Sequence, residues 1–181
     1  MSFQSSVAIY QGAGVPGEQY SDSPWIAQSY TINSASAAYN IIGATGCSIT
    51  SEGFVAAGNA GGGKVYAGIL VDPKNVALFG TGGIPLNPTL TVPNYTQVEC
   101  ATSGSFWVTL TGSGGSGAAN IGDWVCYNLT TGALTSVAPG TSLPSGTAWA
   151  NATVTYFTLA AAGLCVITLQ PGVGQPTNYT A

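Results

Sequence analysis

The sequence predicts an all-β protein in which an extended N-terminal arm, residues 1–30, precedes a single antiparallel sandwich or barrel-like body, residues 31–181. Short segments rich in β-branched and aromatic residues recur along the chain, and each is bounded by Gly, Pro or Asn. The 26 Gly and 10 Pro are spread over the whole length, which disfavours helices. At 181 residues the chain is long enough for one domain to bury its own core.

The N-terminal arm is predicted from residues 1–30, which mix Gly, Pro, Ser and Gln with isolated aromatic residues and show no helical period. Such an arm can add a strand to the exposed sheet edge of a partner, where backbone hydrogen bonds supply affinity and aromatic side chains fill pockets. The alternative is an arm that packs back onto its own domain.

The strands of the body are predicted by period-two alternation. In residues 65–71, Val65, Ala67, Ile69 and Val71 are expected on one face. In residues 105–111, Phe106, Val108 and Leu110 are expected on one face and Trp107 on the other. Further strands are predicted at residues 96–100, 124–128, 134–137, 153–159 and 164–169. Only residues 34–42 and 75–79 suit short helical turns, and the Gly/Ser run at 112–117 predicts a flexible loop.

A β-hairpin is predicted over residues 121–134, "IGDWVCYNLTTGAL". Gly132 supplies a positive φ in its loop. Bulky residues alternate on both faces of residues 124–128, so we expect this strand to be covered on each side. Asp123 is expected at the strand entry, with its carboxylate accepting local backbone N–H bonds.

The charge of the chain restricts its partners. It has two Lys, no Arg, no His and six Asp or Glu, so 4% of its residues are charged and the net charge is −4. Nucleic acid and anionic membrane surfaces are excluded as partners, because two lysines cannot neutralise a run of phosphates. The most apolar stretch, residues 154–169, is shorter than a membrane-spanning helix. Binding to any partner is expected to change by less than about tenfold between low and high salt, since few ion pairs are available for screening.

The sequence predicts no catalytic, cofactor or metal site. Without His, a Ser or Cys nucleophile lacks its usual base. A catalytic pair of carboxylates would have to come from the acids outside the arm, the turns and the hairpin start. Glu52 and Glu99 are the acids that remain, and nothing in their spacing supports such a pair. The cysteines have no metal-ligand spacing, so buried free thiols are expected, with one or two disulfides as the alternative. They are Cys47, Cys100, Cys126 and Cys165.

Three stretches together resemble the cement, or head-decoration, proteins of tailed bacteriophage capsids. They are "SFQSSVAI" at residues 2–9, "VPGEQYSDSP" at 15–24, and "GSFWVTLTG" followed by "IGDWVCYNLTTGAL". As in that family, an N-terminal segment with Phe-Gln and a Pro-Gly-acid motif precedes a β-rich body with a "GDxV…TGxL" hairpin. The sequence departs from the family where Trp25 follows Pro24, because related sequences often have a basic residue there. Stacking or burial is expected to replace that charge.

The resemblance implies a non-enzymatic virion protein, made in the host cytoplasm, that binds the outside of an assembled capsid and stabilises it. It implies the major capsid protein as partner, together with self-association into a homo-oligomer, a trimer first among the choices. A fibre-type or receptor-binding β module of a virion is the alternative. The residues expected at the interface with the capsid or another partner are Phe3, Gln4, Tyr10, Pro16, Glu18, Tyr20 and Trp25.

Overall fold

The computed structural model describes residues 14–20, 24–58, 65–72, 90–110, 119–156 and 163–170. These residues form nine strands and one short 3-10 helix, η1 (Ala37–Tyr39), so the all-β prediction is confirmed. The strands are β1 (Ile26–Ile32), β2 (Gly46–Ser51), β3 (Phe54–Ala57), β4 (Val65–Val71), β5 (Gln97–Leu110), β6 (Trp124–Asn128), β7 (Leu134–Val137), β8 (Thr147–Tyr156) and β9 (Gly163–Leu169).

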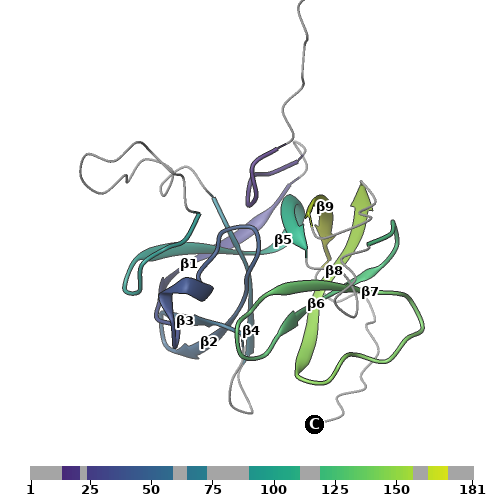
Figure 1. The fold of residues 1–181 in the computed structure, drawn as a ribbon. Coiled ribbons are helices and arrows are strands. Elements are labelled where there is room, and N and C mark those ends of the chain that lie inside the picture. The colour runs from purple at the N-terminus through teal and green to yellow at the C-terminus, as the bar shows by residue number, and fades with distance from the viewer. Residues whose placement is uncertain are drawn as a thin grey trace, which may run out of the picture.

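The first half of the chain forms a five-stranded barrel in the order β1-β3-β2-β4-β5, with β5 pairing back to β1 (Figure 1). Four of its five pairings are antiparallel, as predicted, but β1 and β3 run parallel. The parallel pair arises because the connection after β1 carries the chain to β2, and the β2–β3 hairpin then returns in the direction of β1. The barrel is therefore mixed.

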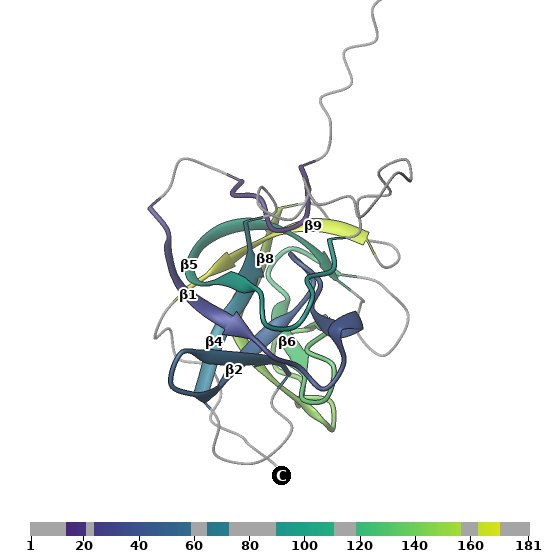
Figure 2. The ribbon, with the colours of Figure 1, turned by 90° about the vertical axis from the view of Figure 1, so that its left-hand side faces the viewer.

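The second half adds β9, β8, β6 and β7, in that order, to the C-terminal part of β5 (Figure 2). Residues 43–46 connect the far strand of this sheet to β5. Thr45 forms a bridge with Ala133, the Leu134 N–H donates to Ala44 O at 3.1 Å, and the Thr109 N–H donates to Gly43 O at 2.8 Å. The second sheet thus curls toward closure through a segment that belongs to the first barrel.

Strand β5 is shared by both halves. Its N-terminal part pairs with β1 and β4, and residues 104–110 pair with β9. The sequence predicts two strands here, at 96–100 and 105–111, whereas the structure has one continuous strand of 14 residues. Gly104 has φ 118°, and a Cβ at this position would lie 2.6 Å from Trp25 Cβ. Glycine therefore lets the strand change direction without ending.

Two apolar cores fill the two halves. The larger core contains the inward residues of β5 to β9, including Phe106, Tyr127 and Ile167, and the smaller core fills the first barrel around Ile32, Leu70 and Val98. As predicted, Phe106, Val108 and Leu110 are all buried on one face of β5, in the larger core. Strand β6 is covered on both faces, as predicted, because Val125 and Tyr127 lie in the larger core while Cys126 packs with Trp124 and Trp149 in a third cluster.

The predicted alternation of β4 is wrong. Ile69 and Val71 face the larger core, but Ala67 lies in the smaller core with Leu70. The cause is a bulge: Cys47 pairs with Gly68 and Ser48 pairs with Tyr66, which leaves Ala67 unmatched. Gly68 has φ 129°, and a Cβ there would lie 2.3 Å from Ala101 O. The bulge reverses which side chains face each core.

The sequence analysis locates β4, β6, β7 and β9 closely, and β8 begins at Thr147, before the predicted residue 153. It misses β1, β2 and β3, and places most of β1 in the arm. The short helical turn expected within 34–42 is present as η1. The turn at 75–79 and the loop at 112–117 lie outside the described residues.

All four cysteines are buried free thiols, as predicted, and the alternative of disulfides is not seen. Burial raises the pKa of Cys165 to about 12 and also raises the pKa of Cys126. For Cys47, a hydrogen bond with Cys100 comes first among the causes that raise its pKa, followed by burial. The thiolate is the form that attacks disulfide reagents, and these raised pKa values make it scarce at Cys47, Cys126 and Cys165 in the folded protein.

We predict that a disulfide reagent such as Ellman's reagent reacts slowly with the native protein at pH 8 and titrates four thiols after unfolding. The folded pKa of Cys165 lies above its ordinary value of 9.0, so its contribution to stability is complete below about pH 9 and falls as the pH rises toward 12. Denaturant titrations across this range measure the decline. Rapid native labelling of any thiol would contradict the burial of the four side chains.

Candidate functional site

The described part of the N-terminal segment, residues 14–20, lies along β5 and is called the strap here. The Gly17 N–H donates to Trp107 O at 2.7 Å, the Trp107 N–H donates to Glu18 O at 2.9 Å, and the Tyr20 N–H donates to Ser105 O at 2.8 Å. Gln19 forms an antiparallel bridge with Phe106. These residues therefore pack back onto the body, while Ile26 already begins β1 inside the range assigned to the arm.

The Pro-Gly-acid motif fixes the strap in place. Gly17 is buried with φ 86°, and a Cβ there would lie 2.3 Å from Ile42 Cγ2. Its carbonyl accepts a bond from the Asp72 N–H at 3.2 Å, next to the end of β4. The Glu18 carboxylate accepts from the Val15 N–H at 3.2 Å and closes the turn. The motif therefore has a structural explanation: glycine permits the close approach and the acid satisfies a turn donor.

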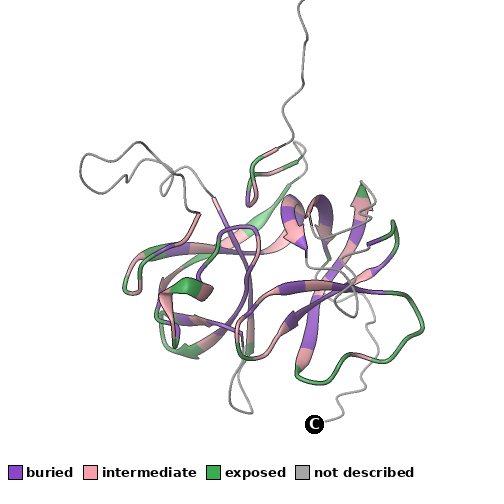
Figure 3. Cartoon of the chain, viewed as in Figure 1, coloured by how far each residue is buried: buried purple, intermediate pink, exposed green. Residues whose placement is uncertain are grey.

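Four aromatic side chains lie around the strap in two groups, which we call together the aromatic face. Tyr20, Trp107 and Tyr156 form one group, and Trp25 packs separately against Phe106, whose side chain points to the opposite side of β5 from Trp107. The ring of Tyr20 lies 5.5 Å from that of Trp107, edge to face, and 5.0 Å from that of Tyr156. Trp25 stands edge to face against the buried Phe106 at 5.7 Å. Tyr20, Trp25 and Tyr156 remain 36%, 40% and 49% exposed. Figure 3 shows the strap and the start of β1 as mostly exposed or intermediate. The inner edges of these three rings are held by ring contacts while their outer surfaces stay open to a partner.

The structure brings four of the seven sequence-predicted interface residues to this region. Pro16 and Glu18 lie in the strap, Tyr20 ends it, and Trp25 precedes β1. Phe3, Gln4 and Tyr10 lie outside the described residues. The sequence analysis did not select Trp107 and Tyr156. A signal existed for Trp107, because it alternates with the core residues Phe106 and Val108 and must therefore point outward.

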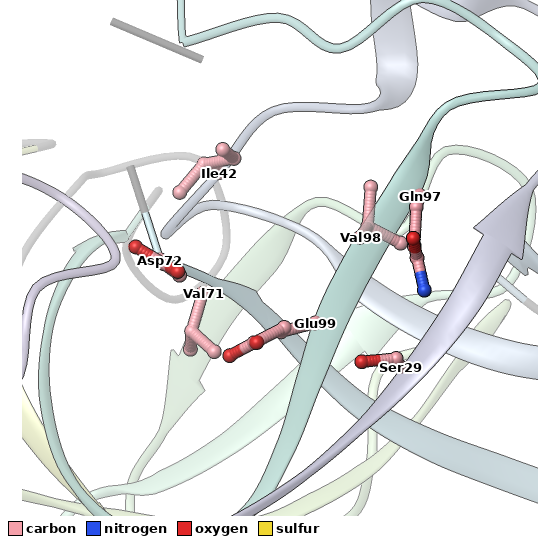
Figure 4. A pocket seen from close by; sticks show the side chains of 7 residues that line it. All are labelled: Ser29, Ile42, Val71, Asp72, Gln97, Val98 and Glu99. Carbon is pink, nitrogen blue, oxygen red and sulfur yellow. The ribbon is translucent and has the colours of Figure 1, made fainter. Parts of the chain in front are cut away.

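Acidic side chains gather beside the strap. Glu18, Asp72 and Glu99 line a hollow of ≈ 380 Å³, together with Trp25 and Phe106. Asp72 and Glu99 also line an adjoining hollow of ≈ 240 Å³, where the Glu99 carboxylate points from β5 toward the end of β4 (Figure 4). Both lysines lie outside the described residues, so the described part of the chain carries carboxylates and no cationic side chain.

The pairing of Glu52 with Glu99 is not what the structure shows. Glu52 lies exposed in the turn between β2 and β3, and it lines neither of the two hollows that contain Glu99. The acids that approach Glu99 are Asp72 and Glu18, which the sequence analysis set aside as turn and arm residues. No cluster of His, Cys, Asp or Glu in the described part of the chain is suited to hold a metal ion. Across the same residues, no helix has the length and apolar character needed to cross a membrane.

The "GDxV…TGxL" hairpin is also explained by packing. Asp123 is buried, and its carboxylate accepts from the Asn120 N–H at 2.8 Å, as predicted. Gly132, with φ 75°, lies so close to residues 45 and 46 that a Cβ would be 2.6 Å from Gly46 O. The hairpin loop thereby docks on the segment that connects the two halves of the fold. Its residues have structural roles, and none is arranged for catalysis.

These features describe an all-β protein with exposed aromatic side chains around the strap. The family model for "Structural cement protein (E217 gp24/Pam3 gp6)" matches residues 3–170. The chain therefore belongs to the phage structural cement protein family, and it is a structural, non-enzymatic component of the virion capsid.

A solved structure shares this fold. A chain in "The capsid of Myoviridae Phage XM1" matches with a TM-score of 0.58 at 16% sequence identity, and the match covers 96% of this chain and 100% of that chain. A comparison with curated proteins gives no match. The family assignment thus depends on the sequence model, and the solved structure supports the fold.

We predict that Gly17→Ala releases the strap. The substitution places a methyl group 2.3 Å from Ile42 Cγ2 at a positive φ, so it should destabilise the protein by more than the roughly 1 kcal/mol expected for a positive-φ alanine alone. Gly53→Ala is the matched control, because Gly53 has φ 74° and no atom within 4 Å of the added Cβ. Urea titration and limited proteolysis near residue 17 compare the two. Equal effects would show that the strap contributes nothing through this contact.

Proposed function

We propose that this cement protein binds the outer surface of the major capsid protein lattice through the strap and the aromatic face, as a symmetric trimer at junctions between capsomers. The residues at this contact are Pro16, Glu18, Tyr20 and Trp25 from the predicted set, joined by Trp107 and Tyr156. Residues 1–13, with Phe3, Gln4 and Tyr10, continue from the strap and belong to the same contact region or to a contact between copies.

The observation that carries the proposal is the exposure of three large aromatic side chains around the strap, each held in place by a ring contact. Trp25 rests on Phe106 and Tyr20 rests on Trp107, so neither ring loses much freedom on binding. Trp and Tyr are enriched among the residues that dominate binding energy at protein interfaces. The family resemblance drawn from the sequence likewise leads us to expect stacking or burial at Trp25 in place of a charge.

The trimer is supported by the resemblance to decoration proteins that act as symmetric oligomers. A closed ring multiplies weak contacts because each further subunit binds at a raised effective concentration. Capsid junctions of matching symmetry would then accept three strap regions at once.

We predict that Trp25→Ala weakens binding to undecorated capsids by at least about tenfold, the usual order for a central aromatic contact. Tyr95→Ala is the control, because Tyr95 is 73% exposed in the turn before β5 and its ring is in none of the aromatic pairs of the aromatic face. Sedimentation of capsids with labelled protein gives both affinities, and thermal unfolding establishes that both variants are folded. Equal affinities for the two variants would remove the aromatic face from the interface.

We also predict that the affinity for capsids changes by less than about tenfold between 50 mM and 500 mM salt, because screening acts on ion pairs and this chain offers few. A larger salt effect would require ion pairs between cationic groups of the capsid and the three carboxylates beside the strap. The triple substitution Glu18→Gln, Asp72→Asn and Glu99→Gln tests this. If the affinity of the unmodified protein depends steeply on salt and this dependence disappears in the variant, ion pairs and not apolar contacts are the main source of affinity.

A further inference from the structure

Strand β1 has an open edge. On one side it pairs with β5 from Ile26 to Thr31. On the other side it pairs with β3 only at Thr31 and Ile32. Among the described residues, nothing pairs with this second edge along residues 26–30, so the barrel is closed at one end of β1 and open along the rest.

The hydrogen bonds at the C-terminal end of β1 determine which groups face the open edge. The Ile32 N–H donates to Thr96 O, on the side of β5, and the Thr31 N–H donates to Gly53 O, on the side of β3. Successive backbone groups of a strand alternate between its two edges. The N–H and C=O groups of Ala27 and Ser29 therefore point away from β5, toward the open edge.

The open edge has the surroundings of a strand-docking site. Ile26 is 57% exposed, Gln28 and Ser29 are exposed, and Trp25 of the aromatic face directly precedes the strand. None of these residues is charged or a proline, which are the residues that commonly protect an edge strand against pairing. An edge of this kind accepts an extended segment through its backbone groups.

The segment best suited to this edge is residues 1–13 of another copy of the chain. It is uncharged, and its "VAIY" at residues 7–10 is strand-forming and bounded by Ser-Ser and Gln-Gly. Fully extended, 13 residues reach about 43 Å from Gly14, which is enough to cross to a neighbouring subunit. Five open positions on β1 match the length of this short segment.

We propose that residues 7–10 of one copy add as a strand to the open edge of β1 in the next copy. Donor and acceptor are different segments of the chain, so we take the contact to be head to tail, and it closes into a ring when the rotation between copies allows. This inference rests on the proposed function, which includes an oligomer, and it supplies the contact that holds that oligomer together. Each subunit of the ring contributes one donor segment and one acceptor edge.

The test uses two complementary variants in solution without capsid. Deletion of residues 1–13 removes the donor and leaves the acceptor edge. Ser29→Pro removes one outward N–H and places a ring on the open edge, a position where an edge strand tolerates proline. Ser29→Ala is the matched control, because it keeps the N–H. Analytical ultracentrifugation over 1–100 μM measures the mass of each protein alone and of mixtures.

The expected results are an oligomer for the full chain and for Ser29→Ala, and monomers for the deletion and for Ser29→Pro. A mixture of the two monomeric variants should form a 1:1 complex, since one supplies the donor and the other the edge. An oligomeric deletion variant, a monomeric full chain or a mixture that does not associate would overturn the proposal. A monomeric full chain whose strap remains protected from proteolysis would also overturn it, with residues 1–13 then bound within their own chain.

A synthetic peptide of residues 1–13 keeps the proposal testable if Ser29→Pro does not fold. It should bind the deletion variant saturably and change the fluorescence of Trp25, while the same peptide with Ile9→Pro should not bind. Absence of binding by the unmodified peptide would overturn the proposal. These measurements involve no capsid, so a failure here is separate from a failure of capsid binding.

Discussion

The fold depends on the continuity of β5 through Gly104. One strand of 14 residues supplies a wall to the first barrel and then a wall to the second sheet, so the two apolar cores are fixed relative to each other by a single backbone. The change of direction needs φ 118° and leaves no room for a side chain between the strand and Trp25. Most of the candidate site is held by this strand, because the strap, β1 and the residue pair Phe106 and Trp107 all belong to it or pair with it, while Tyr156 comes from β8.

A chain with so few charges must obtain specificity elsewhere, and here it comes from backbone hydrogen bonds and close glycine contacts. Gly17, Gly68 and Gly132 each stand where a Cβ would overlap another segment of the chain. Such contacts determine which segments meet as firmly as ion pairs do, and they do not weaken in salt. A capsid protein exposed to changing ionic conditions benefits from an architecture of this kind.

The sequence was sufficient for the fold class and for most strands of the second half, because alternation is clear where one strand face meets a large core, as at Phe106, Val108 and Leu110. In the first barrel it missed β1, β2 and β3 and located β4 with the wrong alternation. Strands β2 and β3 are short, and both faces of β4 are buried around a bulge, so a simple period does not describe them. For the site, the aromatic residues near the N-terminus could be selected from the sequence, and the alternation of Trp107 with Phe106 and Val108 marks it as an outward residue. Nothing in the sequence places Tyr156 beside Tyr20, because that contact joins the strap to the end of β8.

In the proposed function, the order of segments along the N-terminal region links capsid binding to association between copies. The strap pairs with residues 105–107 of β5, and β1 pairs with the preceding residues of the same strand, with Trp25 between them. A strand added to the open edge of β1 would immobilise the backbone that positions Trp25, and the aromatic face would then meet the capsid already ordered. If Trp25 is already ordered before the protein binds the capsid, less conformational entropy is lost in the binding step. Each contact between copies would then strengthen the contact with the capsid. A protein with weak individual contacts can stabilise a capsid in this way because its subunits bind the shell and each other through the same strand.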